Sequence, residues 1–366
     1  MKQGWEIKKI KDICYKESSN IAQNKIVELD GDYPVYGASG FIQNVDFYQR
    51  DTNYIGVVKD GSRVGRVNIY PAFSSLLGTL QYILPKNGFH INYVAYALKS
   101  LNLSKYASGA AIPHIYFKDY GEEVIPVPPP PVQEQIVSEL DLLSGIIEKK
   151  REQLKELDAL AQSIFYDMFG DPITNEKGWE VKKLGEEFNI SSGGTPDTKI
   201  THYWDGGNIS WIGSNMCQNE IIYNNDGKYI TDLGLSNSSA KVYQEGYVLV
   251  ALVGATIGKT ALLRFPTATN QNVAGINVPQ NSEYTSEFIF CLIRNLYELF
   301  VSIGSGKFKM ANLSFIRSLP LLSPPLPLQH QFASKIEAIE RQKELIKQSI
   351  SETETLFNAR MQHYFN

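Results

Sequence analysis

The chain has 366 residues, 43% of them hydrophobic and 20% charged, and a net charge of −4. This length favours two folded domains, and the composition excludes a disordered chain and a strongly basic, non-specific nucleic-acid binder. No segment stays apolar for the roughly 18 residues that a membrane span needs. The first five residues also lack the apolar region of a signal peptide, so we expect a cytoplasmic protein.

The two halves of the chain contain similar segments in the same order. Gly4-Trp5-Glu6 returns as Gly178-Trp179-Glu180, and Pro131-Val132-Gln133 returns as Pro327-Leu328-Gln329. Two similar halves in one polypeptide predict a pseudo-twofold arrangement. Duplex DNA is a natural partner for such an arrangement, because its strands are themselves related by twofold symmetry.

The composition and pattern of two segments, residues 1–130 and 171–325, are typical of α+β domains. Both segments are rich in Gly, Asn, Tyr and Ser, and both contain short β-prone runs bounded by turn residues. The predicted strands are Tyr54–Val58, Tyr82–Leu84, Tyr247–Val250 and Gly275–Val278, and the predicted helices are Asn92–Leu101 and Ser286–Phe300.

Residues 131–170 and 326–366 are predicted to form two long helices. Apolar residues recur at steps of three and four, as in the a/d seam of a coiled coil. The predicted seams are Ile136, Leu140, Leu143, Ile147, Leu154, Leu157, Ala161, Ile164 and Met168 with Lys150 among them, and Phe332, Ile336, Ile339, Lys343, Ile346, Ile350, Thr353, Phe357, Arg360 and Tyr364. We expect each helix to begin just after a proline-rich run, and Gly170 followed by Pro172 to end the first helix.

One segment resembles a phosphate-binding P-loop but departs from its pattern. Residues 253–260 end in Gly258-Lys259-Thr260, yet valine stands at position 253, where a P-loop needs glycine. The matching segment of the first half, residues 60–67, has Arg66 in place of the lysine. We therefore predict a strand, a tight turn and a second strand in each half, with a basic tip that can touch a DNA phosphate or a guanine edge.

The sequence motifs of common catalytic and metal sites are missing together. We find no Asn/Asp-Pro-Pro-Tyr/Phe element of an adenine methyltransferase, no nuclease cluster, no HExxH and no GxSxG. The three cysteines are scattered without a CxxC pair, and the five histidines show no ligand spacing. We expect a protein without catalytic residues, metal or cofactor.

The combination of motifs resembles the specificity subunit of type I restriction-modification systems. The Gly-Trp-Glu segments open each half, Tyr33–Phe41 (Tyr-Pro-Val-Tyr-Gly-Ala-Ser-Gly-Phe) lies in the first domain, and Gly193-Gly194-Thr195-Pro196 with Tyr203-Trp204 and Trp211-Ile212-Gly213 lies in the second. The resemblance implies two target recognition domains that each read one half of a bipartite DNA site, held apart by two antiparallel helices. It also implies two docked methyltransferase subunits and a motor-nuclease subunit.

The hypothesis is thus sequence-specific recognition of double-stranded DNA. The candidate contacts are Tyr36, Ser39, Lys59, Ser62, Arg63, Arg66 and His114 in the first domain, and Thr195, Tyr203, Trp211, Thr256, Lys259, Asn270, Gln271, Asn272, Lys307 and Lys309 in the second. Two alternatives stay open from the residues alone. The chain could be a single-chain methyltransferase or nuclease, or an adaptor that holds two proteins and reads no sequence.

Overall fold

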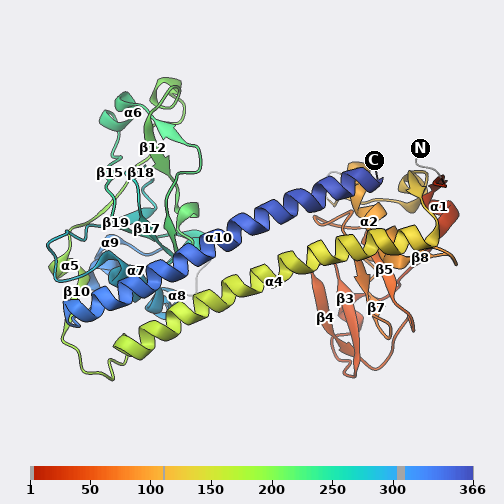
Figure 1. Ribbon diagram of the computed structural model, residues 1–366, viewed down its shortest axis with the longest axis horizontal. Helices are drawn as coiled ribbons and strands as arrows, with labels where there is room; N and C mark the ends of the chain where they lie inside the picture. Colours follow the sequence, from red (N-terminus) through yellow and green to blue (C-terminus); the bar gives the residue numbers. More distant parts are fainter. Residues whose placement is uncertain (1–3, 110–111, 303–309, 366) are drawn as a thin grey trace. The chain divides into compact units, whose positions relative to one another are not determined.

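The computed structural model describes residues 4–109, 112–302 and 310–365. The chain divides into two compact units, Met1–Lys150 with Ser349–Asn366 and Arg151–Gln348. Each unit contains one globular part and one end of each long helix (Figure 1).

The first unit contains two sheets and a separate strand pair. Strand β1 (Glu6–Lys9) pairs antiparallel with β9 (Val124–Val127). The larger sheet has the order β2-β8-β5-β6 and is antiparallel throughout, and the smaller sheet has the order β4-β3-β7. The strands of these sheets are β2 (Cys14–Ser18), β3 (Tyr33–Gly37), β4 (Gly40–Val45), β5 (Tyr54–Val58), β6 (Val67–Tyr70), β7 (Ser75–Leu76) and β8 (Leu80–Pro85). The helices of the globular part are α1 (Ile10–Ile13), η1 (Gln23–Lys25), α2 (Ile91–Ser100), η2 (Leu103–Tyr106) and α3 (Phe117–Tyr120).

The second unit repeats this frame with different additions. Strand β10 (Val181–Lys183) pairs antiparallel with β20 (Pro320–Leu322), and the larger sheet has the order β11-β19-β16-β17-β13. A further sheet has the order β14-β12-β18-β15. The strands are β11 (Ile190–Ser192), β12 (Ile209–Ile212), β13 (Glu220–Ile222), β14 (Tyr229–Ile230), β15 (Val242–Tyr243), β16 (Val248–Ala251), β17 (Thr260–Leu263), β18 (Thr267–Thr269) and β19 (Val273–Ile276). The helices are α5 (Leu184–Glu187), η3 (Thr201–Tyr203), η4 (Ser214–Met216), α6 (Asp232–Ser236), η5 (Gly254–Thr256), α7 (Ser286–Asn295), α8 (Tyr297–Val301) and α9 (Leu313–Ser318).

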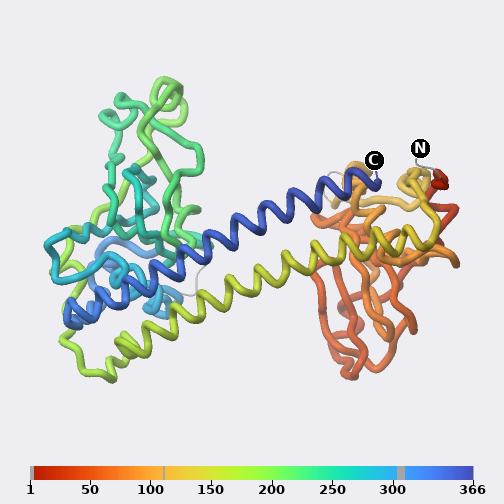
Figure 2. The backbone as a smooth tube through the Cα atoms, viewed as in Figure 1, coloured from red at the N-terminus to blue at the C-terminus, as the bar shows by residue number. Residues whose placement is uncertain are grey.

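The strand order of the first unit's larger sheet recurs in the second unit. The sequence β2-β8-β5-β6 corresponds to β11-β19-β16-β17, and the second unit adds β13 in parallel to β17. Strands β11 and β19, far apart in the sequence, pair antiparallel, and the tube in Figure 2 traces the course of the chain from red at the N-terminus to blue at the C-terminus. The prediction of two α+β domains with a common frame is confirmed. The predicted helix Ser286–Phe300 is interrupted, because α7 ends at Asn295 and α8 begins at Tyr297.

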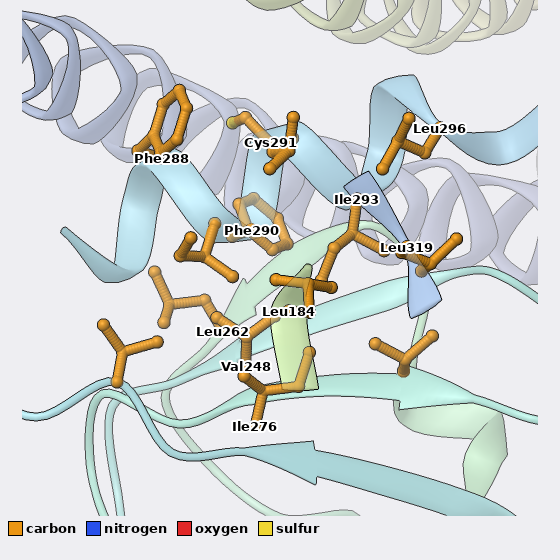
Figure 3. Packing of buried hydrophobic residues seen from close by; sticks show 14 of the residues in the cluster. Leu184, Val248, Leu262, Ile276, Phe288, Phe290, Cys291, Ile293, Leu296 and Leu319 are labelled. Atoms are coloured by element: carbon orange, nitrogen blue, oxygen red, sulfur yellow. The ribbon is translucent and has the colours of Figure 1, made fainter. Parts of the chain in front are cut away.

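The frame sheet and the helix after it bury a common core in each unit. In the second unit, Phe288, Phe290 and Ile293 of α7 pack with strand residues such as Val248 and Ile276 (Figure 3). Full burial of such side chains contributes about 1.5–3 kcal/mol each. In the first unit, Tyr93 of α2 shares a core with residues of α1, β5 and β8.

The two long helices each span 40 residues, α4 (Pro130–Phe169) and α10 (Leu326–Phe365). The prediction that they begin after the proline-rich runs is wrong by one or more residues, because Pro130, Pro131 and Pro327 lie inside the first turns. Proline is tolerated there because the first N–H groups of a helix have no partner within the helix. The predicted stop is confirmed. Gly170 has φ of +77° and its N–H donates to Tyr166 O at 2.8 Å.

Within each unit the ends of the two long helices run antiparallel. In the first unit Glu139 of α4 pairs with Arg360 of α10 at 2.8 Å, while Lys150 donates to Ser349. In the second unit Asp158 of α4 meets Lys343 of α10 at 2.8 Å, and the rings of Phe169 and Phe332 lie 5.1 Å apart.

The predicted seams are confirmed at most positions but not at Arg360. That residue is exposed and bonds Glu139 from the edge of the pair, whereas Lys343 is buried. A straight helix drifts relative to a strict seven-residue repeat, so the buried stripe moves around the helix. In α4 this drift brings Phe165 and Phe169 into the core.

In each unit, one buried glutamine in the first turn of the long helix hydrogen-bonds to the backbone of the globular part. Gln133 Nε2 donates to Pro128 O, and its Oε1 accepts from His90 N, both at 2.9 Å. Gln329 Nε2 donates to Glu283 O at 3.0 Å and Pro324 O at 2.8 Å, and its Oε1 accepts from Thr285 N at 3.0 Å. His90 and Thr285 immediately precede α2 and α7. The repeated Pro-x-Gln motif therefore links two helices in each unit.

Candidate nucleic-acid interface

A tight turn joins two neighbouring strands of the frame sheet in each unit, as predicted. The turns follow β5 and β16 and precede β6 and β17. Each turn has two glycines in the left-handed region, Gly61 and Gly65 in the first unit and Gly254 and Gly258 in the second. A Cβ at Gly65 would lie 2.5 Å from Ser104 N, so only glycine fits there. Strand β17 follows directly after Lys259 where a P-loop would place a helix, so the P-loop interpretation is excluded.

Five predicted residues of the first unit gather around this turn. Lys59 Nζ lies 3.6 Å from Asp60 Oδ2, and His114 Nδ1 hydrogen-bonds Asp60 Oδ1. Gly61 N donates to Pro113 O at 2.9 Å, which holds the His114 segment against the turn. Ser62, Arg63 and Arg66 complete the turn, and the side chains of Ser62 and Arg66 are exposed.

The β3–β4 hairpin of the first unit continues this surface through Thr79. The carbonyl of Thr79 accepts from Lys59 N at 3.0 Å, and Thr79 lines a pocket together with the exposed Ser39 at the hairpin turn. Tyr36 differs from Ser39, because its ring packs against Tyr70 at 4.8 Å. Of these two predicted contacts, Ser39 is therefore the one with an exposed side chain.

In the second unit, five predicted residues converge on the junction of β18 and β19. Thr195 Oγ1 donates to Gln271 Oε1 at 2.6 Å. Asn270 N donates to Ile212 O at 3.2 Å, directly after Trp211, and Asn272 N donates to Asn270 Oδ1 at 3.0 Å. Gln271 is the exposed tip of this group.

Trp211 is buried next to this junction and contacts it through Gly194. It is 8% exposed, and its Nε1 donates to Gly194 O at 3.0 Å. Gly194 N in turn donates to Thr269 O at 2.8 Å, and a Cβ on Gly194 would lie 2.2 Å from Ser239 Oγ. The indole of Trp211 is therefore buried, with its N–H bonded inside the unit, and its contact with DNA stays a prediction.

The turn of the second unit lies beside the same junction. Leu252 N donates to Asn272 O at 2.8 Å, and Lys259 N donates to Thr256 O at 2.9 Å. Lys259 Nζ donates to Gln218 Oε1 at 2.7 Å, a partner that carries no charge. The predicted contacts Lys307 and Lys309 lie outside the described residues.

Tyr203 lies at the end of η3, next to α6. Its carbonyl accepts from Thr231 N at 3.0 Å, next to α6. Its neighbour Trp204 stacks edge-on with Trp211 at 5.2 Å, which ties the Tyr203 segment to the supporting tryptophan.

The three cysteines of the chain are buried. Burial raises the pKa of each cysteine, Cys14, Cys217 and Cys291, to about 12, so the thiols stay protonated at neutral pH. Among residues 4–109, 112–302 and 310–365, no three His, Cys, Asp or Glu side chains are grouped as metal ligands. In the same residues, no helix combines the length and the apolar character that crossing a bilayer requires.

Three polar residues beside Ser39 were not among the predicted contacts: Asn20, Gln23 and Gln49. Asn20 and Gln23 line the pocket beside Ser39, and Gln49 contacts Asn20 at 3.2 Å. The only sequence signal was the polar run around Asn20, which no periodicity distinguishes from a solvated loop.

Comparison with known proteins gives one consistent result. A model of the type I restriction modification DNA specificity domain matches residues 2–158 and 176–355. Two specificity subunits of Methanocaldococcus jannaschii are similar: MjaIX is 24% identical over 92% of this chain and 86% of its own length, and MjaVIII is 26% identical over 94% and 86%.

Solved structures show the same fold at low sequence identity. The S subunit of a type I restriction-modification system from M. genitalium superposes with a TM-score of 0.63 at 16% identity, covering 99% of this chain and 96% of that one. A chain from a structure on complex assembly and conformational transition of the type I R-M system gives 0.54 at 15% identity, covering 98% and 97%. The chain belongs to the type I restriction-modification DNA specificity family, whose members recognise DNA, assemble with methyltransferase and restriction subunits and are not themselves catalytic.

Proposed function

We propose that this chain reads a bipartite, asymmetric DNA site. Residues 1–130 would read one half-site and residues 171–325 the other, while residues 131–170 and 326–366 would set the distance between them. The observation that carries the proposal is the repeated frame, β2-β8-β5-β6 and β11-β19-β16-β17, with different additional sheets beside it. A shared frame with unlike loops supports one mode of docking and two different base sequences.

The basic turns supply the part of binding that does not depend on sequence. Lys59, Arg63 and Arg66 in the first unit and Lys259 in the second would neutralise phosphates. The side chains next to them carry the donors and acceptors that distinguish bases: Ser39 and His114 in one unit, and Asn270 and Gln271 in the other.

The long helices are proposed as both ruler and docking surface. At 1.5 Å per residue, a helix of 40 residues is about 60 Å long. Leu142 and Leu345 are 64% and 67% exposed on α4 and α10, and Leu160 and Leu356 are also exposed. Such apolar side chains favour protein partners. We propose two methyltransferase subunits and one motor-nuclease assembly there, in the cytoplasm where the chromosome lies.

A domain exchange tests the division of labour. In the complex with methyltransferase subunits, residues 11–125 are replaced by the corresponding domain of another specificity subunit, and methylated adenines are mapped in genomic DNA. One half-site should change while the other half-site and the spacer stay the same. Protection of DNA without any sequence preference would instead support an adaptor and overturn the proposal.

A second experiment tests the ruler. Two helical turns' worth of residues are inserted at matched positions in α4 and α10, so that the seam is kept. The spacer should lengthen while both half-sites are preserved. An unchanged spacer would contradict the role of the helices in setting the distance.

A further inference from the structure

A pocket of about 650 Å³ lies between the β3–β4 hairpin and the segment before η1 in the first unit. Its wall combines two amides, Asn20 and Gln23, with the hydroxyls of Ser39 and Thr79 and the apolar side chains of Ala38 and Ile42. The four polar residues are exposed. Such a mixture of apolar surface and a few polar groups suits the edge of a nucleobase.

A chain of hydrogen bonds runs from the smaller sheet to this pocket. Leu76 N donates to the hydroxyl of Tyr82 at 2.7 Å, and the same hydroxyl donates to Gln49 Oε1 at 2.7 Å. Gln49 Nε2 then donates to Asn20 Oδ1 at 3.2 Å. Tyr82 is 1% exposed, so its partners come from the protein.

The backbone N–H of Leu76 sets the donor and acceptor roles along this series of hydrogen bonds. A backbone N–H can only donate, so the Tyr82 oxygen acts as acceptor toward Leu76 and its hydrogen is used on Gln49. If the Gln49 amide were turned over, its NH₂ group would face the tyrosine and leave the buried hydroxyl hydrogen without this acceptor. The Gln49 amide therefore keeps its NH₂ group toward Asn20.

The orientation of the Gln49 amide in turn sets the orientation of the Asn20 amide. Asn20 Oδ1 accepts from Gln49, so the Asn20 Nδ2 group faces away from Gln49. Among the described residues, Nδ2 of Asn20 has no acceptor within hydrogen-bond distance. Asn20, which lines the pocket, thus offers a hydrogen-bond donor whose orientation is set before any ligand arrives.

We propose that Asn20 determines base specificity at one position of the half-site read by the first unit, as a fixed donor to an acceptor-bearing base edge. Guanine N7 and O6, adenine N7 and thymine O4 are such acceptors, whereas cytosine offers only its N4 donor in the major groove. Gln49 is a positioning residue that acts through Asn20. This inference rests on the proposed function, because it needs residues 1–130 to lie on DNA.

The basic turn next to the pocket supports nucleic acid as the ligand. Thr79 both lines the pocket and accepts from the backbone N–H groups of Lys59 and Asp60 at 3.0 and 3.3 Å. Phosphate contacts from Lys59, Arg63 and Arg66 would hold the duplex while the pocket reads an edge.

The test uses the full chain in complex with its methyltransferase subunits and a library of duplexes randomised over the half-sites. Asn20→Asp keeps the acceptor toward Gln49 but replaces the outward donor by an acceptor. It should shift preference at one position toward cytosine, the base that offers only a donor, by about tenfold. Asn20→Ala should abolish discrimination at that position. Asn87→Asp is the matched control, because it adds the same charge on an exposed turn after β8 and should leave the half-site unchanged.

Gln49→Glu tests the orientation itself. The introduced carboxylate has only acceptor oxygens, so it accepts from Tyr82 and needs a donor from Asn20. The Asn20 amide therefore turns over, so that Nδ2 faces position 49 and Oδ1 faces away from it. The same position should then prefer a donor-bearing base although Asn20 is unaltered. A merely structural role for Gln49 would lower stability without changing which base is preferred.

The outcomes separate this inference from the proposed function. If the unmodified complex selects no sequence, the proposed function itself fails. If it selects a bipartite site and Asn20→Asp and Gln49→Glu leave every base preference unchanged, the inference is overturned and the proposed function stands. A change confined to the half-site of the second unit would also overturn the inference.

Discussion

The two units are most alike where they hold the long helices and least alike where they present loops. Gln133 and Gln329 occupy the same place in the frame, and both are buried and tied to the backbone before α2 or α7. Beside that frame, the first unit carries the sheet β4-β3-β7 and the second carries β14-β12-β18-β15. Buried bonds constrain the frame, whereas exposed loop residues can vary at little cost to stability.

The long helices contain a second contrast of the same kind. Lys150 meets the neutral hydroxyls of Ser349 and Thr353 in the first unit. In the second unit, Lys343 is 3% exposed and bonds both Glu340 and Asp158 at 2.8 Å. Burial alone would lower the pKa of Lys343, but the two carboxylates outweigh burial and the pKa is raised. One lysine is therefore part of a buried ionic cluster and the other is not.

The largest effect is expected from breaking that cluster. Lys343→Met should destabilise the second unit by about 3 kcal/mol, because Glu340 remains buried without its cation. Lys150→Met should change stability by less than about 0.5 kcal/mol, since it leaves only hydroxyls that can rotate. Urea unfolding of both variants measures the difference. Equal losses would show that the buried charge at Lys343 has no special role.

The next effect compares the two glutamines. Gln329→Leu removes three hydrogen bonds and should cost about 2 kcal/mol, while Gln133→Leu removes two and should cost about 1 kcal/mol. Thermal unfolding of each variant gives the ranking. The reverse ranking would indicate that the polar groups left behind reach water more easily in the second unit.

These contrasts show what the sequence could and could not predict. The long helices were predicted from the spacing of apolar residues. The turn before Lys259 was predicted because Val253 and Arg66 depart from the P-loop pattern. The helix starts were missed because proline is acceptable in a first turn. The shortest strands of the extra sheets, such as Ser75–Leu76 and Tyr229–Ile230, were missed because they have two residues, too few for any periodicity. The role proposed for Asn20 depends on Gln49 and Tyr82, which are distant in the sequence.

A smaller effect should distinguish the two basic turns. Lys259 contacts a neutral amide, whereas Lys59 lies 3.6 Å from the carboxylate of Asp60. Lys259→Ala should reduce the slope of log affinity against log salt by about 0.9, the value for one lost phosphate contact, and Lys59→Ala should reduce it by less. Binding of the methyltransferase complex to its site is measured from about 50 to 200 mM salt. Half-site preferences should not change in either variant.

The smallest expected effect concerns the amide that the second unit presents. Thr195 donates to Gln271 Oε1, so Gln271 also turns its NH₂ group outward, but the threonine hydroxyl can accept as well as donate. The Gln271 amide can therefore turn over at little cost, unlike that of Asn20, whose orientation goes back to a backbone N–H. Thr195→Val should then change base discrimination at the Gln271 position by no more than about threefold, well below the tenfold change expected for a good base contact. Gln49→Glu in the first unit supplies the comparison on the same duplex library. If Thr195→Val shifted base preference as much as Gln49→Glu does, the Thr195 hydroxyl would hold the Gln271 amide as firmly as Tyr82 and Gln49 hold that of Asn20.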